Sequence, residues 1–344
     1  MTSPLRIGLL GAGWFGREAH LANLVSLEGC TVVAASSRSE ESRAAASIMV
    51  GDELQCFEDW RQLLDEVELD AVIVALTNDQ HHEAAIRAFE KGAHVLCEKP
   101  LGLTLAECDE IIAAGERAGK VLQVGHEMRF QKLYVEAKRI LDEDGVGDLK
   151  LLWCREFRGP MRPGWRSSEA LTGGTLLEKN CHHFDLFSWF VGEKPVRVTA
   201  TGGTDVLTDR EILDNAQVTV EFEGGIRATL ELCLFAPVGG ECEIGFVGTG
   251  GRIDTRNQAL ELDHHRFEPA ASETRTIEDD DSISFLDSSG RIDRGILPQL
   301  EHFLECCRTG ATPLNDGASA RIAVAICLAA RESIRTAAAV KVVC

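Results

Sequence analysis

The sequence has no long apolar run, no excess of positive charge and no paired Cys-x-x-Cys motif. No apolar run reaches the roughly 18 residues that a membrane-spanning helix needs, so a membrane span is not expected. Acidic residues outnumber basic ones by 55 to 35, and the formal net charge of −20 argues against nucleic acid or an anionic membrane as a partner. The 12 cysteines lie mostly in apolar runs, which is typical of small buried thiols, and disulfides are not expected.

The N-terminus lacks the features of a secretory signal. It has no positively charged segment followed by an apolar stretch, and a strand-like apolar run begins almost at once. We therefore expect a cytoplasmic protein. At 344 residues the chain is long enough for two domains of ordinary size, each with its own core.

Glycines with the spacing G-x-G-x-x-G follow the first apolar run of the chain. The run covers residues 6–10, and a helix-like stretch follows the glycines, which are Gly11, Gly13 and Gly16. The first glycine permits a tight turn, the second lets the backbone approach a pyrophosphate, and the third lets the helix pack closely on the strand. The first amides of that helix, near Trp14 and Phe15, then face the phosphates. This context predicts a dinucleotide-binding loop, against the alternative of a glycine-rich turn with no ligand.

Apolar runs alternate with helix-like segments through the first third of the chain. The run at 71–75 is almost purely alanine and β-branched residues, which suits a strand buried on both faces. Strands separated by helices imply a parallel, doubly wound sheet. We therefore predict an α/β fold that begins with a Rossmann dinucleotide-binding domain over residues 1–125. Its expected strands are 6–10, 31–35, 71–75, 94–97 and 121–124, and its expected helices are 40–49, 81–91 and 104–118.

The pattern changes after Gly125. Long runs of alternating apolar and polar residues, separated by glycine turns, predict a large and mostly antiparallel sheet. We therefore predict an α+β domain over residues 126–344. Its expected strands are 149–157, 196–201, 217–222, 226–233 and 241–247, and its expected helices are 130–141, 176–190 and 318–339. The pair His264-His265 lies in a charged stretch that we interpret as a surface loop.

The predicted strand 94–97 runs into the sequence Glu98-Lys99-Pro100. Ligands of an open parallel sheet bind beyond the carboxyl ends of its strands, so Lys99 is expected beside the nicotinamide. Its ammonium group would hydrogen-bond a substrate oxygen and stabilise the negative charge that develops there. The alternative is a solvated lysine before a helix-starting proline.

The predicted helix 176–190 carries a second reactive set. Glu178, His182 and Asp185 are spaced i, i+4 and i+7, so they share one helix face. The His182 imidazole would take a hydroxyl proton while hydride leaves the same carbon, and Glu178 would orient the ring. Asp185 is expected to hold the domain together, and His183 is rotated by about 100° and points elsewhere. These groups are plausible zinc ligands, but no further ligand cluster is evident, so no metal site is expected.

Three further residues are candidates for substrate binding, and two for cofactor choice. A tryptophan face suits a sugar ring and guanidinium groups suit hydroxyls, which points to Arg129, Trp165 and Arg166. The alternatives are packing for the tryptophan and surface charge for the arginines. An acidic residue about 20 positions beyond the glycines binds the ribose of NAD, but Ser37 stands there and Arg38 follows it. Because a serine does not repel a 2′-phosphate and an arginine pairs with it, we expect a preference for NADP over NAD.

Several of these motifs together resemble one known family. The glycine motif, Asn78-Asp79-Gln80-His81 and the segment 94–100 are similar to those of the glucose–fructose oxidoreductase, inositol dehydrogenase and MocA superfamily. Arg129-Phe130, Gly145 to Leu149, Gly173 to Leu177 and Cys181 to Leu186 extend the resemblance over nearly the whole chain.

The resemblance implies a Rossmann domain followed by an open-faced sheet domain, and oxidation or reduction of a sugar, inositol or related polyol with NAD or NADP. It implies that Lys99 is the catalytic lysine, in a cis bond with Pro100. It implies that Glu178 and His182 take the places of a catalytic aspartate and histidine, with glutamate replacing aspartate. Expected cofactor contacts are Leu76, Thr77, Asn78, His81, Glu98 and Lys99, although Leu76-Thr77 departs from the family's usual Thr-Pro.

Two other functions stay open. One is a glycosidase-type enzyme that oxidises its substrate transiently, and the other is a nucleotide-binding regulator without catalysis. The presence of both Lys99 and His182 argues against the regulator. An uncovered sheet face would favour subunit pairing, so a homodimer or homotetramer is expected.

Overall fold

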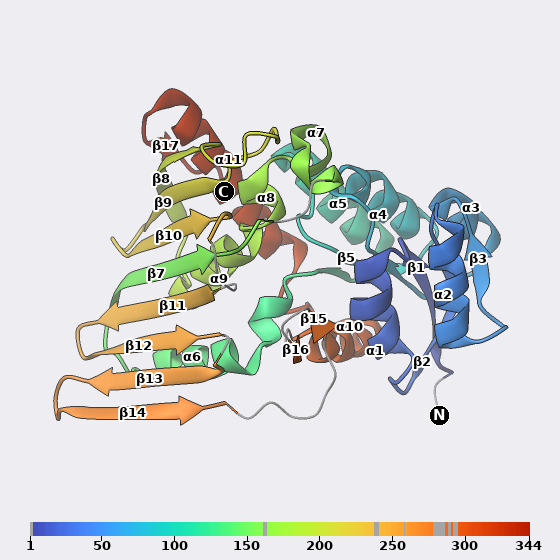
Figure 1. The fold of residues 1–344 in the computed structure, drawn as a ribbon. Helices are drawn as coiled ribbons and strands as arrows, with labels where there is room; N and C mark the ends of the chain where they lie inside the picture. Colours follow the sequence, from blue (N-terminus) through green and yellow to red (C-terminus); the bar gives the residue numbers. More distant parts are fainter. Residues whose placement is uncertain are drawn as a thin grey trace. The chain divides into compact units, whose positions relative to one another are not determined.

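Two sheets organise the chain, each in its own unit (Figure 1). The computed structural model describes residues 3–160, 164–236, 241–257, 259–277, 286–287, 290–291 and 295–344. The first unit contains Met1–Phe130 and Asp281–Arg321, and the second contains Gln131–Asp280 and Ile322–Cys344. The first division lies close to the boundary expected at residue 125. The return of the chain to the first unit was not predicted.

The first unit holds six parallel strands in the order β3-β2-β1-β4-β5-β6. All four residues of β4 are buried, as expected for a strand covered on both faces. The order reverses between β1 and β4, and ligands of such sheets bind at this switch point. The strands are β1 (Leu5–Leu10), β2 (Cys30–Ser36), β3 (Gln55–Phe57), β4 (Ala71–Val74), β5 (His94–Cys97) and β6 (Leu122–Val124).

Helices surround this sheet. The segment after the glycine motif is a π-helix, η1 (Gly16–Leu21), which leads into α1 (Ala22–Leu24). Thr104 and Glu107 form a capping box that fixes the start of α5. The other helices are α2 (Glu40–Val50), α3 (Trp60–Glu66), α4 (His81–Glu90), α5 (Leu105–Ala118) and α10 (Ile296–Thr309), with short 3-10 turns η2 (Asn78–Gln80) and η3 (Glu127–Phe130).

Helix α10 explains why the chain returns to the first unit. Its residues Ile296, Leu300, Phe303 and Leu304 are buried in the same core as the strand β1. Their spacing places them on one helix face, and that face packs on the first unit. A two-stranded ladder, β15 (Leu286–Asp287) with β16 (Gly290–Arg291), precedes α10.

The second unit is built on nine strands in the order β14-β13-β12-β11-β7-β10-β9-β8-β17. Among the described residues of this sheet, only β7 and β10 pair in parallel. Burial alternates along the strands, because helices cover one face of the sheet. The strands are β7 (Leu149–Phe157), β8 (Pro195–Gly203), β9 (Asn215–Phe222), β10 (Arg227–Cys233), β11 (Glu241–Gly248), β12 (Gly251–Arg256), β13 (Glu261–Arg266), β14 (Ala271–Thr276) and β17 (Val340–Lys341).

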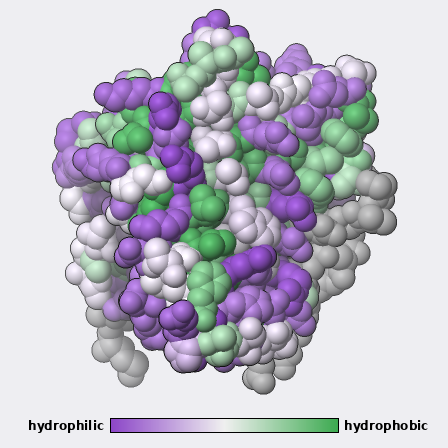
Figure 2. Space-filling view, turned by 90° about the vertical axis from the view of Figure 1, so that its left-hand side faces the viewer, coloured by the Kyte–Doolittle hydropathy of each residue, from purple (hydrophilic) through white to green (hydrophobic). Residues whose placement is uncertain are grey.

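Helices α6 and α9 pack against strands β12, β13 and β7. The helices of this part of the chain are α6 (Lys132–Asp142), α7 (Glu169–Thr172), α8 (Thr175–Glu178), α9 (Cys181–Val191) and α11 (Gly317–Thr336), with the 3-10 turn η4 (Trp165–Ser167). Figure 2 shows the side of the molecule that lies at the left of Figure 1, where hydrophilic residues surround a narrow band of hydrophobic ones.

Two sequence expectations for the second unit were wrong. The helix expected over 176–190 is divided into α8 and α9, because the backbone leaves the regular helix at Lys179 and Asn180. The carbonyl of Asn180 accepts bonds from both His183 and Phe184, and asparagine favours such a helix start over a helix interior. His264 lies in strand β13 and is buried, with its Nε2 atom 2.8 Å from the Gly145 carbonyl.

All 12 cysteines are free thiols. Among the described residues, no helix combines the length and the apolar character that crossing a membrane requires.

Candidate active site

The glycine loop connects β1 to η1 at the switch point of the first sheet. Gly11 has φ +100°, and a Cβ atom there would lie 2.3 Å from the Ala75 carbonyl oxygen. A Cβ at Gly16 would lie 2.1 Å from the Gly11 carbonyl oxygen. A Cβ at Gly13 would meet nothing within 4 Å. Gly11 and Gly16 are therefore required by the fold itself, whereas the side of the loop at Gly13 is open to a ligand.

This difference gives a test of the loop. We expect Gly13→Ala to fold with an unchanged melting temperature but to bind the dinucleotide at least about tenfold more weakly, since the new methyl group occupies the approach to the phosphates. Gly16→Ala should instead lower the melting temperature, because its Cβ meets backbone. Thermal unfolding and calorimetric titration measure the two effects. Wild-type affinity in a folded Gly13→Ala protein would show that the phosphates do not lie on this loop.

Trp14 and Phe15 begin the helix after the loop. Trp14 is 53% exposed. Phe15 is half-buried, and its ring meets the ring of His20 edge-on at a centroid distance of 5.5 Å. A bound cofactor would therefore reach Trp14 more easily than Phe15.

Arginines surround the turn after β2, where Ser37 and Arg38 lie. Arg38 is exposed and Ser37 is half-buried. Arg43 Nη1 donates to the carbonyls of Ser37 at 2.6 Å and of Arg38 at 3.2 Å. Arg17 Nη1 donates to the Ala12 carbonyl at 2.9 Å and to Ser42 Oγ at 3.0 Å. Sequence reasoning missed Arg17 and Arg43, although the start of α2 at Glu40 places Arg43 in the first turn of the helix that follows Arg38.

Lys99 lies just beyond the carboxyl end of β5. It is partly exposed, whereas Glu98 and Pro100 on either side of it are buried. The expected cis bond between Lys99 and Pro100 is present. Glu98 Oε1 lies 2.8 Å from His20 Nε2, and Glu98 Oε2 accepts a bond from the Lys99 backbone at 3.2 Å.

The pKa of the Glu98 carboxyl group is lower than usual in this site. Burial alone would raise the pKa of its carboxyl group, but the hydrogen bond and charge of His20 and the charge of Lys99 lower that pKa below its usual value. Glu98 therefore supports the backbone of Lys99 and ties it to η1. Both of these contacts are with the protein itself.

The structure places His81 differently from its expected cofactor contact. No part of the His81 side chain is exposed. Its Nδ1 atom lies 2.8 Å from the Pro100 carbonyl and its Nε2 atom 3.2 Å from the Leu76 carbonyl, and burial lowers its pKa. His81 therefore joins the loop after β4 to the loop after β5. Leu76 and Thr77 are half-buried in the first of these loops, and Asn78 is 4% exposed.

Arg129 is also placed differently from the expected substrate contact. It is 4% exposed, and its Nη1 atom donates to the Leu314 carbonyl at 2.6 Å within the first unit. The sequence shows that Arg129 is charged, but it does not show that the guanidinium group is buried and bonded to the backbone.

In the second unit, Trp165, Arg166 and Glu178 lie together. Arg166 Nε is 3.1 Å from Glu178 Oε1, and the Arg166 guanidinium stacks over the Trp165 ring at 4.7 Å from its centroid. Glu178 ends α8 and is 7% exposed. Trp165 and Arg166, two of the predicted substrate contacts, are therefore neighbours of Glu178, the predicted catalytic carboxylate.

His182 and His183 have different environments, as expected. His182 is partly exposed, whereas His183 is 3% exposed. The shared helix face expected for Glu178 and His182 is not formed by one continuous helix, because α8 ends before α9 begins. Asp185 is buried, in agreement with its expected structural role.

Sequence reasoning missed a buried group of charges behind His183. Glu156 on β7 is 1% exposed, and its Oε1 atom lies 2.7 Å from Arg158 Nε and 3.5 Å from Lys179 Nζ. Burial would raise the pKa of Glu156, but these two cations and His183 hold it well below its usual value. Burial likewise would lower the pKa of His183, yet Cys242 and Glu156 raise it to about 9. The sequence did contain an indication of this group: Glu156 stands at a position of β7 where the alternation of apolar and polar residues predicts a buried side chain.

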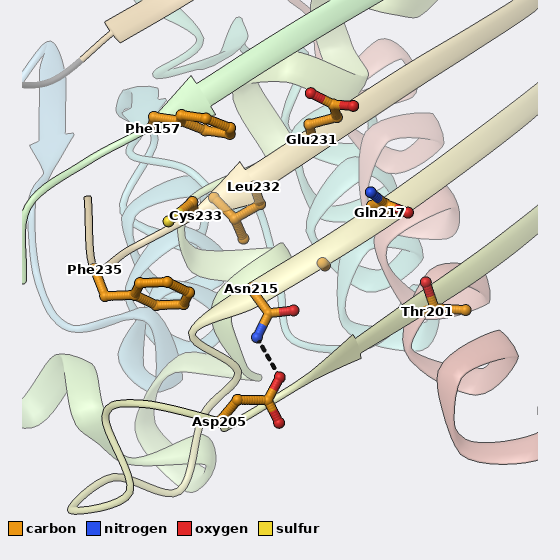
Figure 3. Close-up of a pocket in the computed structure, with 10 residues that line it drawn as sticks. Phe157, Thr201, Asp205, Asn215, Gln217, Glu231, Leu232, Cys233 and Phe235 are labelled. Atoms are coloured by element: carbon orange, nitrogen blue, oxygen red, sulfur yellow. Dashed lines mark hydrogen bonds between the residues drawn. The ribbon is translucent and has the colours of Figure 1, made fainter.

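A cavity of about 420 Å³ lies at the ends of β7, β9 and β10 (Figure 3). At one side of it, Asn215 donates a hydrogen bond to Asp205 at 2.7 Å. Its described lining residues, which include none of the predicted site residues, are Phe157, Thr201, Asp205, Asn215, Ala216, Gln217, Glu231, Leu232, Cys233 and Phe235.

Comparisons with known proteins agree with this architecture. An "Oxidoreductase family, NAD-binding Rossmann fold" model matches residues 5–126, and a "GFO/IDH/MocA C-terminal domain" model matches residues 134–254. The chain is 31% identical over 251 residues to "Inositol 2-dehydrogenase 2" of Saccharopolyspora erythraea, covering 72% of each chain. It is 26% identical to "scyllo-inositol 2-dehydrogenase (NAD(+))" of Bacillus subtilis, covering 97% of this chain and 95% of that one.

Solved structures share the whole fold. An oxidoreductase domain protein from Kribbella flavida matches with a TM-score of 0.89 at 21% identity, covering 99% of this chain and 100% of that one. Together with the family models and the inositol dehydrogenase relatives, this means that the chain belongs to the Gfo/Idh/MocA family of NAD(P)-dependent oxidoreductases.

Proposed function

We propose that the protein is a dehydrogenase that oxidises a secondary hydroxyl group of an inositol or related polyol, or reduces the matching ketone. The observation that carries this proposal is the glycine loop at the switch point of a sheet whose strand β5 ends at Cys97, two residues before Lys99. The names of the inositol dehydrogenase relatives support the substrate class.

Each predicted residue has one task in this proposal. Lys99 donates a hydrogen bond to the reacting oxygen and stabilises its developing charge. His182 takes the hydroxyl proton during oxidation and returns it during reduction. Trp165 and Arg166 bind the ring and hydroxyls of the substrate, and Glu178 fixes the Arg166 guanidinium at 3.1 Å. A bound nicotinamide supplies the acceptor for the hydride.

The expected preference for NADP is part of the proposal. Arg43 donates to the carbonyls of Ser37 and Arg38, and Ser37 itself is neutral. We expect Arg38→Ala to lower kcat/KM for NADP by about tenfold while leaving kcat/KM for NAD nearly unchanged, because only NADP offers a 2′-phosphate to the guanidinium. Arg227→Ala, at an exposed position of the second unit, is the matched control. A wild-type preference for NAD, together with an Arg38→Ala protein that still uses NADP normally, would refute the preference.

One substrate panel separates the proposed function from its alternatives. Sugars, glycosides, inositols and the keto forms of these compounds are incubated with NAD(H) and NADP(H), and both the absorbance of the reduced nicotinamide and the release of free sugar are followed. Accumulation of reduced cofactor with a polyol supports the dehydrogenase. Cleavage of a glycoside without such accumulation supports transient oxidation, and binding of nucleotide with no turnover of any substrate supports a regulator.

We also propose assembly into a homodimer or homotetramer in the cytoplasm. The second sheet alternates buried positions with polar ones, so its less covered face offers a surface to a second copy. Sedimentation velocity measures the assembly, and a monomer at all concentrations would contradict it.

A further inference from the structure

Two cysteines and a histidine meet on the buried face of the second sheet. Cys154 lies on β7, Cys242 on β11 and His183 on α9. Their two sulfur atoms and a ring nitrogen all lie within 4.8 Å of one another. The three residues are 1%, 5% and 3% exposed. The strand pairing explains the meeting, because Cys154 pairs with Ile244 and Cys242 pairs with Glu156, which puts both cysteines on one face.

We propose that Cys154, Cys242 and His183 bind a zinc ion. Thiolate sulfur and imidazole nitrogen are the donors that zinc prefers in proteins. Binding forms two zinc–sulfur bonds and one zinc–nitrogen bond and releases the thiol protons, with no change of oxidation state. The site is separate from the proposed dehydrogenase chemistry, which uses neither cysteine.

The distances around His183 fit a tetrahedral ion. His183 Nε2 lies 3.5 Å from Cys242 Sγ and 3.5 Å from Glu156 Oε2. Zinc bonds of about 2.3 Å to sulfur and about 2.0–2.1 Å to nitrogen or oxygen place a sulfur and a nitrogen ligand about 3.5 Å apart, and a nitrogen and an oxygen ligand about 3.4 Å apart. A charge-assisted hydrogen bond between nitrogen and carboxylate would be shorter, at about 2.7–2.9 Å. The spacing therefore suits ligands that share one ion.

An unsatisfied oxygen faces the same nitrogen. Glu156 Oε1 is held by Arg158 and Lys179, but Glu156 Oε2 has no hydrogen-bond partner among the described residues. A buried carboxylate oxygen in this condition needs a cation or a donor. It is the group available for the fourth position of the ion.

Asn180 supplies the outer support that a histidine ligand needs. Its amide nitrogen lies 3.3 Å from His183 Nδ1, and its Oδ1 atom has no partner among the described residues. Rotating the amide by half a turn brings Oδ1 to the place from which it accepts the Nδ1 proton. Metal-bound histidines usually donate their second nitrogen to a carbonyl in this way, which leaves the Nε2 lone pair for the ion.

A disulfide explains the cluster less well. Cys154 and Cys242 are diagonal neighbours on adjacent antiparallel strands, and such neighbours are about 7–8 Å apart. The Cα atoms of a disulfide are usually about 4.4–6.8 Å apart, so the strands would have to move. Zinc needs no such movement, and with two thiolates it adds no net charge beside Glu156, Arg158 and Lys179.

The decisive measurement is the metal content of the whole protein. We expect about one zinc ion per chain by mass spectrometry, and a cobalt titration of the metal-free protein should give a thiolate-to-cobalt absorption band that saturates at about one ion per chain. Cys154→Ser and Cys242→Ser should lose both signals. Cys108→Ser, a buried cysteine of the first unit, should keep them.

A zinc-free protein that gives no cobalt–thiolate band would overturn the site. The cobalt titration of the unaltered chain decides the matter alone if a serine variant does not fold. Because none of these readouts uses dehydrogenase activity, failure of the zinc site and failure of the proposed function are told apart.

Discussion

We expect Lys99→Met to lower turnover by about two orders of magnitude or more while the dinucleotide still binds. Removing one preorganised donor from a developing oxyanion costs about 10²–10³ in rate in comparable sites. Methionine keeps the unbranched stem of lysine and removes only the ammonium group. The backbone should stay in place, because Glu98 holds the Lys99 amide and His81 holds the Pro100 carbonyl.

Steady-state kinetics measure the turnover of the variant, and calorimetric titration measures its affinity for the cofactor. A fall in kcat with an unchanged cofactor Kd would assign Lys99 to the transition state. Lys91→Met removes an exposed lysine at the end of α4 and serves as the control. Near-normal turnover in Lys99→Met would end the catalytic role of this residue.

Replacing each of the two adjacent histidines by alanine should affect a different property: turnover for His182 and thermal stability for His183. His182→Ala should lower turnover by about 10²–10⁴, the usual contribution of a general base, with little change in melting temperature, because His182 is partly exposed. His183→Ala should lower the melting temperature by several degrees, because it removes a buried partner of Glu156.

Added imidazole should restore part of the activity of His182→Ala, since a small base fills the place of the lost ring. It should not raise the melting temperature of His183→Ala. If a folded His183→Ala protein lost turnover and His182→Ala kept it, the transfer of the hydroxyl proton would have to be assigned to His183.

The first sheet and its loop could be predicted because their signals are local. β4 is a continuous apolar run, and the three glycines stand where one strand turns into one helix. Lys99 follows from the same logic, since the carboxyl end of a parallel strand identifies the ligand side. Such features need no knowledge of distant parts of the chain.

The missed features depend on contacts between distant residues. The apolar face of α10 does not say which sheet it covers, and β13 carries charged residues that suggested a loop for His264. Arg129 and His81 have polar side chains that are satisfied by backbone carbonyls far along the chain, at Leu314 and Pro100. Sequence reasoning reads a polar side chain as available for a ligand unless a partner is visible nearby.

The cluster of Cys154, His183 and Cys242 was missed for the same reason. The pairing of β7 with β11 brings together residues 88 positions apart, and α9 adds the histidine. Neither cysteine has the close Cys-x-x-Cys spacing that marks a zinc site in sequence.

The return of α10 to the first sheet has a consequence for synthesis on the ribosome. Domains usually fold in order as the chain emerges, with the N-terminal one first. Here the core around β1 stays incomplete until Phe303 and Leu304 have been made, after almost all of the second sheet has already emerged. The glycine loop therefore gains its finished support late in translation, and a nascent chain cut short after residue 280 would expose the apolar surface that α10 covers.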